Sequence, residues 1–190
     1  RELVQNSRDA GAAMIDIRVE RSGDNLRITC RDDGSGMDRD HMARYLLRLY
    51  ASSKEFQEGT VGVFGVGFWS VLRVNPCKIR VFSHTGKSGC GVDIDCRRGQ
   101  VRDVPCPRTG SGTDIELTLD TPVDAEEPVT RARERLLHYC GHVRPHPSRN
   151  HIQLAFNGES LVRPFALPLI TGTTIRTVRF VVPVMSGKAK

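Results

Sequence analysis

Three polar residues near the start of the chain, Glu2, Asn6 and Asp9, are spaced four and three positions apart. In a helix this spacing places all three side chains on one face. A carboxylate on such a face can orient or deprotonate a water molecule, and a nearby carboxamide oxygen is a ligand that Mg2+ accepts. A solvated helix face carries the same residue types, so the triplet alone leaves both interpretations open.

An acidic segment rich in glycine, Asp-Asp-Gly-Ser-Gly, occupies residues 32–36. It follows a predicted strand and precedes a predicted helix, so its glycines permit a tight turn that lets a flat ligand approach the backbone. The carboxylate of Asp32 could accept a hydrogen bond from an exocyclic amine such as that of adenine. An ordinary turn and a calcium-type acidic loop are the alternatives for this segment alone.

A second glycine-rich segment, Gly-Val-Phe-Gly-Val-Gly-Phe, occupies residues 62–68 and opens a predicted helix. Its backbone N–H groups and the positive end of that helix would form a cradle for phosphates. The segment is not a Walker A loop, because no Gly-Lys-Ser or Gly-Lys-Thr follows it, and it does not close a Rossmann βαβ unit. A flexible loop is the alternative. Further along, Gly112 and Thr113 open a late strand, where the threonine hydroxyl could join Asp32 at a bound base.

Four motifs therefore occur in order: Glu-x-x-x-Asn-x-x-Asp-Ala, Asp-x-Gly-x-Gly, Gly-x-x-Gly-x-Gly and Gly-Thr. This order resembles the GHKL ATPases, which include DNA gyrase B subunits, ninety-kilodalton heat-shock chaperones, sensor histidine kinases and MutL mismatch-repair proteins. Within that superfamily the amino-acid sequence of residues 1–10, 53–56 and 63–70 is most similar to that of the heat-shock chaperones. The resemblance extends over about residues 1–120.

The resemblance implies a role for each matching position. Glu2 would activate the attacking water, Asn6 would hold Mg2+, and Asp9 would support that site. Asp32 would bind the adenine amine. The other implied nucleotide contacts are Gly36 and Met37 lining the base pocket, Thr113 at the base, Lys54 at the phosphates, and the backbone of Gly62, Val63, Phe64, Gly65, Val66, Gly67 and Phe68 around the phosphates. ATP and Mg2+ are the implied cofactors, and residues 38–61 would form a lid that closes over the nucleotide.

The elements that must position these residues can be predicted from the patterning of the chain. A helix is expected from the first residues, and helical runs are expected at 39–50, 68–74 and 122–141. Alternating residues predict a hairpin at 15–20 and 26–31, an antiparallel meander at 78–83, 91–95, 100–104 and 113–119, and a hairpin at 152–162 that starts a new unit. The expected fold is α+β, a two-layer α/β sandwich of the Bergerat (GHKL) type with a mixed, mostly antiparallel sheet and helices on one face.

Length and composition set the expected organisation of the chain. With 190 residues, 38% hydrophobic and 26% charged, it fits one ordinary domain and the beginning of a second. Residues 1–148 are expected to form the ATP-binding domain without the family's first strand and helix, and residues 149–190 to begin a following domain or linker. The sequence has no apolar run of the roughly 18 residues that a membrane span requires. We therefore expect a cytoplasmic protein with no membrane partner and with reduced cysteines.

The expected function is a Mg2+-dependent ATP-hydrolysing domain of a chaperone-like protein, in which nucleotide-driven lid closure is coupled to protein folding or remodelling. ATP and ADP, client proteins and a homodimer formed through other regions are its expected partners. The net charge of +6 motivates an alternative, a GHKL ATPase of the mismatch-repair or topoisomerase type, although the basic excess is not clustered and DNA is not the favoured partner. A sensor module that binds nucleotide without turnover is a further alternative, and the presence of Glu2 argues against it.

Overall fold

The computed structural model describes residues 1–46, 66–120 and 126–161 of the chain. The strands are β1 (Met14–Ser22), β2 (Asn25–Asp32), β3 (Lys78–His84), β4 (Gly89–Asp95), β5 (Gln100–Val104), β6 (Gly112–Asp120), β7 (Gln153–Phe156) and β8 (Glu159–Ser160). The helical elements are α1 (Glu2–Asp9), α2 (Arg39–His41), the π-helix η1 (Met42–Leu46), α4 (Val66–Trp69), the 3-10 helix η2 (Ser70–Val74) and α5 (Glu126–Cys140).

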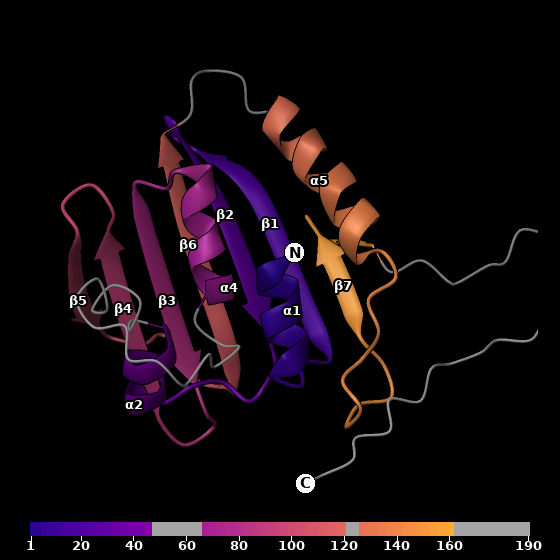
Figure 1. The fold of residues 1–190 in the computed structure, drawn as a ribbon, viewed down its shortest axis with the longest axis horizontal. Coiled ribbons are helices and arrows are strands. Elements are labelled where there is room, and N and C mark those ends of the chain that lie inside the picture. The colour runs from indigo at the N-terminus through magenta and orange to yellow at the C-terminus, as the bar shows by residue number, and fades with distance from the viewer. Residues whose placement is uncertain (47–65, 121–125, 162–190) are drawn as a thin grey trace, which may run out of the picture.

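The strands form a single sheet in the order β5-β4-β3-β6-β2-β1-β7-β8. Neighbouring strands pair antiparallel, except that β1 and β7 are parallel. The helices α1, α4 and α5 all lie against one face of this sheet (Figure 1). The predicted α+β fold, a two-layer sandwich with a mixed and mostly antiparallel sheet, is confirmed for the described residues.

The first hairpin follows directly from residue chemistry. Alternation buries Ile15, Ile17 and Val19 on the helix-covered face of β1, and β2 pairs with it antiparallel over its whole length. Gly23 has φ 63°, a value that glycine adopts at little cost, and this allows the chain to reverse between the two strands. The hairpin predicted at 15–20 and 26–31 is confirmed.

The predicted meander is correct for its first three strands and wrong for the fourth. β3, β4 and β5 are consecutive neighbours, but β6 does not pair with β5 and instead lies between β3 and β2. A central position suits β6, because its inward-facing Ile115 and Leu117 are both buried. The return of β6 sets Thr113 opposite Ser83 and Asp114 opposite Arg31, so three strand ends meet in one place.

Two hydrophobic clusters fill the space between helices and sheet. The first contains residues of α1, β1, β2, α5 and β7, and the second contains residues of η1, α4, β3, β4 and β6. Leu3, Ile28 and Leu119 pack against both clusters, so the core is continuous. Each large side chain buried in this way stabilises the fold by roughly 1.5–3 kcal/mol.

The helical predictions need two corrections. The run predicted at 39–50 is a short α2 continued by the π-helix η1, with Asp38 accepting a hydrogen bond from the backbone N–H of His41 at 2.8 Å; residues 47–50 lie outside the described residues. The helix predicted at 68–74 begins earlier, at Val66, and tightens into η2. It ends at Asn75, which takes a left-handed conformation with φ 53°. The helix predicted at 122–141 contains α5.

The segment expected to begin a following domain at residue 149 contains β7 and β8, which belong to the same sheet. β7 pairs with β1, with Ile15 opposite Leu154 and Ile17 opposite Phe156. Leu154 and Phe156 are buried in the first cluster, so the described part of 149–190 is continuous with the sheet and its core. No helix within the described ranges is long and apolar enough to cross a membrane.

Candidate functional site

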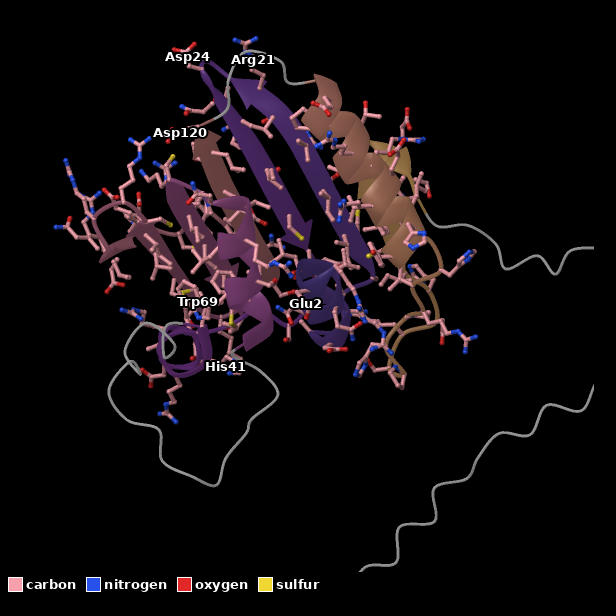
Figure 2. All side chains as sticks on the ribbon, turned by 45° about the horizontal axis from the view of Figure 1, so that its top comes forward. Glu2, Arg21, Asp24, His41, Trp69 and Asp120 are labelled. Carbon is pink, nitrogen blue, oxygen red and sulfur yellow. The ribbon has the colours of Figure 1, made fainter. Side chains whose placement is uncertain are left out.

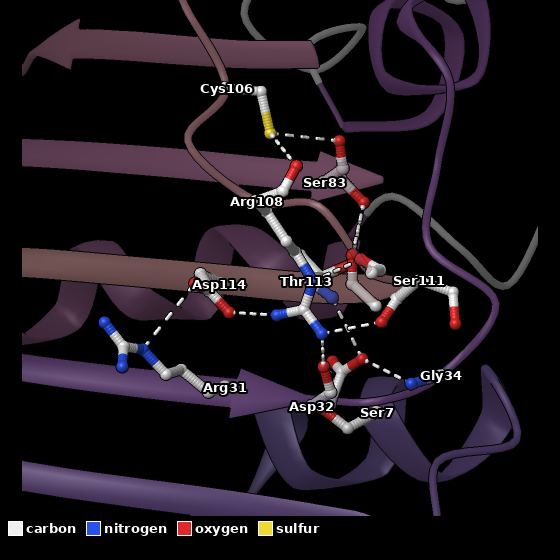
Figure 3. Close-up of polar contacts among 12 residues, drawn as sticks. Ser7, Arg31, Asp32, Gly34, Ser83, Cys106, Arg108, Ser111, Thr113 and Asp114 are labelled. Atoms are coloured by element: carbon white, nitrogen blue, oxygen red, sulfur yellow. Dashed lines mark hydrogen bonds and ion pairs between the residues drawn. The ribbon is translucent and has the colours of Figure 1, made fainter. Parts of the chain in front are cut away.

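The side chain of Asp32, the last residue of β2, is the centre of a buried polar cluster (Figure 3). Its carboxyl group accepts a hydrogen bond from Ser7 Oγ at 2.8 Å, from the backbone N–H of Gly34 at 3.0 Å and from the backbone N–H of Thr113 at 3.1 Å. These three donors are all uncharged. A carboxylate offers roughly four acceptor positions, so the described residues leave one for a further donor.

The environment of Asp32 perturbs its acidity in two directions. Burial raises the pKa of the carboxyl group, and the hydrogen bonds from Ser7, Gly34 and Thr113 and the charge of Arg108 oppose that rise without cancelling it. Within the described residues no cation forms an ion pair with its carboxyl oxygens.

A second set of contacts ties Thr113 to the next strand. The hydroxyl of Ser83 on β3 lies 2.9 Å from the hydroxyl of Thr113 and donates to the carbonyl oxygen of Gly112 at 3.2 Å. The backbone N–H of Met37 donates to the same Ser83 oxygen at 2.8 Å. Because Ser83 is fully buried, these bonds fix the positions of Met37 and Thr113 relative to β3.

Two glycines allow the backbones around Asp32 to approach one another. Gly36 has φ 67°, and a Cβ atom there would lie 2.0 Å from the carbonyl oxygen of His84. Gly112 has φ 124°, and a Cβ atom there would lie 2.1 Å from the carbonyl oxygen of Asp32. A side chain at either position would therefore separate the turn after β2 from the ends of β3 and β6.

The residues predicted to bind a base come together in the fold. Asp32, Gly36, Met37 and Thr113 lie in or beside the polar cluster just described, although they come from two distant parts of the chain. Asp32 and Thr113 are buried, whereas Gly36 and Met37 are half-buried. The arrangement can present an acceptor and a hydroxyl to the edge of a flat polar ligand.

The residues predicted for water activation and metal binding lie on α1. Glu2 is half-buried, and Asn6 and Asp9 are exposed. Asp9 is held within its own helix, because Gln5 Nε2 and Arg8 Nη1 each donate to its carboxylate at 2.9 Å. Among the described residues, neither Glu2 nor Asn6 is held by such a side-chain pair.

The helix α1 lies beside α4, which holds the last residues of the second glycine-rich segment (Figure 2). The backbone of Val66, Gly67 and Phe68 is helical there, and the Phe68 side chain is buried against Trp69 with ring centroids 5.2 Å apart. The other predicted phosphate contacts lie outside the described residues: Lys54, Gly62, Val63, Phe64 and Gly65. The end of the predicted cradle and the predicted water activator thus share one face of the sheet.

Three residues of the site are absent from the sequence predictions: Ser7, Ser83 and Arg108. A signal existed for the two serines, because each is a small polar residue at a core-facing position, beside Val4 in α1 and after Val81 in β3. Arg108 lies in the connection between β5 and β6, where no periodic pattern points to a buried side chain. Its contacts are visible only in the folded chain.

The described residues fit the two groups that the motifs imply. The remaining acceptor of Asp32 fits an exocyclic amine, and the exposed carboxamide of Asn6 fits an oxygen-seeking cation. In the part of the chain that the structure describes, no group of three or more His, Cys, Asp or Glu side chains is arranged to hold a metal ion.

Comparison with known proteins gives the family context. A profile described as histidine kinase-, DNA gyrase B-, and HSP90-like ATPase matches residues 1–98. A DNA mismatch repair protein MutL from Anaeromyxobacter sp. (strain K) is 31% identical over 128 residues, which cover 64% of this chain and 21% of that protein. MutL proteins from Listeria welshimeri and Halalkalibacterium halodurans are 33% and 32% identical over 62% of this chain. The chain spans about a fifth of the length of the curated relatives it matches.

These relatives change one expectation from the sequence. The amino-acid sequence around the motifs favours the heat-shock chaperones, but the relatives reported above are mismatch-repair proteins. They match the alternative expectation of a mismatch-repair ATPase better. The difference has a physical basis, because the shared motifs serve nucleotide chemistry and carry no information about the macromolecule acted upon. The matching profile covers more than half of the chain and includes α1, the Asp32 turn and α4, and the chain therefore belongs to the histidine kinase-, DNA gyrase B- and HSP90-like ATPase family.

Proposed function

We propose that this chain is the ATP-binding domain of a Mg2+-dependent ATPase that acts on DNA, of the mismatch-repair type. The observation that carries the nucleotide part of the proposal is the Asp32 carboxyl group, which is buried, held by three uncharged donors and left with an open acceptor position. The names of the relatives support the DNA part.

The acceptor at Asp32 selects the base. Adenine presents an exocyclic amine where guanine presents a carbonyl oxygen, and only the amine can donate to a carboxylate. Ser7 donates to Asp32 and the backbone N–H groups of Gly34 and Thr113 do the same, so the carboxyl group is held as an acceptor. Placing guanine there would oppose two acceptors in a buried site, which is unfavourable by roughly 1–3 kcal/mol.

Hydrolysis is assigned to the polar face of α1. Glu2 would accept a proton from the attacking water, and Asn6 would bind Mg2+ through its carboxamide oxygen, with Asp9 supporting this face of the helix. When bound, the cation would neutralise negative charge on the phosphates. The neighbouring position of α4 supports this assignment, because α4 contains the last residues of the glycine-rich segment proposed to hold the phosphates.

The remaining parts of the proposal concern regions that the structure describes only in part, such as residues 38–61, of which 38–46 are described, or not at all. Residues 38–61 would act as a lid over the nucleotide, Lys54 would contact the phosphates, and a homodimer would form through other parts of the protein. A net charge of +6 suits a polyanionic partner, and we place the protein in the cytoplasm. Client-protein remodelling is set aside, because the relatives do not support it.

The proposal can be tested on the full-length protein with Glu2→Ala and with Glu20→Ala as the matched control, because Glu20 is exposed on β1 and pairs with Arg27. ATP binding is measured by calorimetry, and ATP turnover is measured with Mg2+, with and without DNA, at low and moderate salt. We expect Glu2→Ala to bind ATP but to lose turnover by at least about 100-fold.

The control should turn over ATP like the wild type. DNA should stimulate the wild-type rate, and this stimulation should fade as salt rises. Turnover retained in Glu2→Ala would contradict the assigned water activation, and a rate that DNA does not change would contradict the DNA-acting branch.

A further inference from the structure

We propose that Arg108 is a positioning residue for the base site, where its guanidinium group joins the Thr113 end of β6 to the Asp32 end of β2. The inference rests on the proposed binding of adenine nucleotide at Asp32. Arg108 itself is not assigned any contact with the nucleotide. It acts through Asp32 and Thr113, to which contacts with the base are assigned.

The side chain of Arg108 makes several polar contacts from the connection between β5 and β6 (Figure 3). Nη2 donates to the carbonyl oxygens of Asp32 and Ser111, each at 2.6 Å, and Nε donates to the carbonyl oxygen of Gly110 at 2.8 Å. Nη1 forms an ion pair with Asp114. One planar guanidinium group thus holds three backbone carbonyls and a carboxylate, which an ammonium group cannot reproduce with the same geometry.

The glycine at the start of β6 makes room for this side chain. A Cβ atom on Gly112 would lie 2.3 Å from Arg108 Nη2 and 2.1 Å from the carbonyl oxygen of Asp32. The guanidinium group therefore occupies the space that Gly112 leaves open between β6 and the end of β2. The side chain of Arg108 is only 17% exposed, as expected for a group that is part of the packing.

Arg108 contacts both of the strand ends that the Asp32–Thr113 hydrogen bond joins. On one side it binds the backbone of Asp32, and on the other it binds Ser111 and Asp114, which flank Gly112 and Thr113. The charge of Arg108 also opposes the rise in the pKa of Asp32 that burial causes. Losing this side chain would let the two halves of the base site separate without touching Glu2 or Asn6.

Arg108→Gln and Arg108→Lys in the full-length protein test this role. Arg31→Gln is the matched control, because Arg31 also approaches Asp114, at 3.6 Å, but is 59% exposed. The dissociation constant of ATP, kcat at saturating ATP and the thermal midpoint are measured for each variant. We expect Arg108→Gln to weaken ATP binding about tenfold, the equivalent of one or two hydrogen bonds, while kcat stays within about twofold.

Arg108→Lys should weaken binding nearly as much, because the ammonium group keeps the charge but not the fork, and it provides the test if the Gln variant does not fold. Arg31→Gln should bind ATP like the wild type. Unchanged ATP affinity in a folded Arg108 variant, or a fall in kcat as large as the loss of affinity, would overturn the inference while the proposed function stood. A wild-type protein that bound no ATP would overturn both.

Discussion

Asp32 and Asp93 are both buried in the same sheet, but they face opposite sides of it and are surrounded by different groups. Asp32 faces the helices and receives hydrogen bonds from three uncharged donors. Asp93 faces away from the helices, and its Oδ2 pairs with Lys78 at 2.9 Å and with Arg80 at 3.3 Å. Burial raises the pKa of both carboxyl groups, but at Asp93 the hydrogen bonds and charges of Lys78 and Arg80 outweigh burial and lower it.

The difference shows how a buried carboxylate can be assigned to structure or to binding. Asp93 is neutralised by cations of the protein, even though its Oδ1 lacks a hydrogen-bond partner among the described residues. Asp32 accepts three hydrogen bonds from uncharged donors, and among the described residues no cation pairs with its carboxyl oxygens. Under the proposed function the orphaned Oδ1 atom does not mark the binding residue, and the ion pairs of Asp93 with Lys78 and Arg80 are what distinguish the two aspartates.

Exchanging the carboxylates for carboxamides gives the largest expected difference. Asp32→Asn should weaken ATP binding by roughly 100-fold, because a charge-assisted hydrogen bond to the base is lost and a donor replaces one acceptor. Asp93→Asn should leave ATP affinity unchanged, since it lies on the opposite face of the sheet. Calorimetric titration of both variants with ATP checks the comparison, and equal losses would show that the distinction is wrong.

The close backbone approach beside Asp32 gives the next effect. Gly36→Ala should lower the free energy of unfolding by about 2 kcal/mol or more, because the new Cβ would meet the His84 carbonyl in a left-handed conformation. Gly23→Ala is the control: its φ of 63° is similar, but nothing lies within 4 Å. It should lose only about 1 kcal/mol. Denaturant unfolding of both variants separates strain from steric contact, and similar losses would count against the close approach.

Stability should respond to Asp93 more than to Asp32. Asp93→Asn should destabilise the fold by about 1–2 kcal/mol, less than for a fully buried pair, because Lys78 and Arg80 are partly exposed. Asp32→Asn should be near neutral or slightly stabilising without ligand, because it removes a buried charge. Urea unfolding of the ligand-free proteins measures both. A larger loss in Asp32→Asn would contradict the roles given to the two aspartates.

The smallest effect is on the pH dependence of stability. The raised pKa of Asp32 gives a contribution that is fully present below the pKa of the unfolded chain and is lost as the pH rises through the folded pKa. The lowered pKa of Asp93 gives a contribution present above the unfolded pKa and lost as the pH falls through the folded one. Asp32→Asn should therefore make stability rise more steeply with pH in the acid range, and Asp93→Asn less steeply. Unfolding curves measured across acid pH check this prediction. A shallower rise of stability with pH in Asp32→Asn than in Asp93→Asn would contradict it.

Much of the fold could be predicted because the local patterns are strong. The β1–β2 hairpin followed from alternation around a glycine turn, and the spacing that placed Glu2, Asn6 and Asp9 in a helix agrees with α1. The position of β6 could not be predicted, because strand order depends on which apolar surfaces meet over long sequence distances and the meander was the simplest local choice.

The site was predictable to the extent that its residues carry motifs. Asp32 and Thr113 could be paired in advance, but Ser7 and Ser83 acquire their roles only when α1 and β3 pack against β2 and β6. Arg108 gave no signal, because an arginine in a connection is ordinarily solvated. The motifs also could not identify the branch of the family. The amino-acid sequence around them favoured the chaperones, whereas the relatives are mismatch-repair proteins.

The most direct test of the central claim is the affinity of the full-length wild-type protein for ATP compared with inosine triphosphate. The two nucleotides share their phosphates and ribose, but inosine carries a carbonyl oxygen in place of the adenine amine. If Asp32 accepts a hydrogen bond from that amine, inosine triphosphate should bind roughly 100-fold more weakly, and the difference should largely vanish in Asp32→Asn. Equal affinity of the wild type for the two nucleotides would show that Asp32 does not read the base.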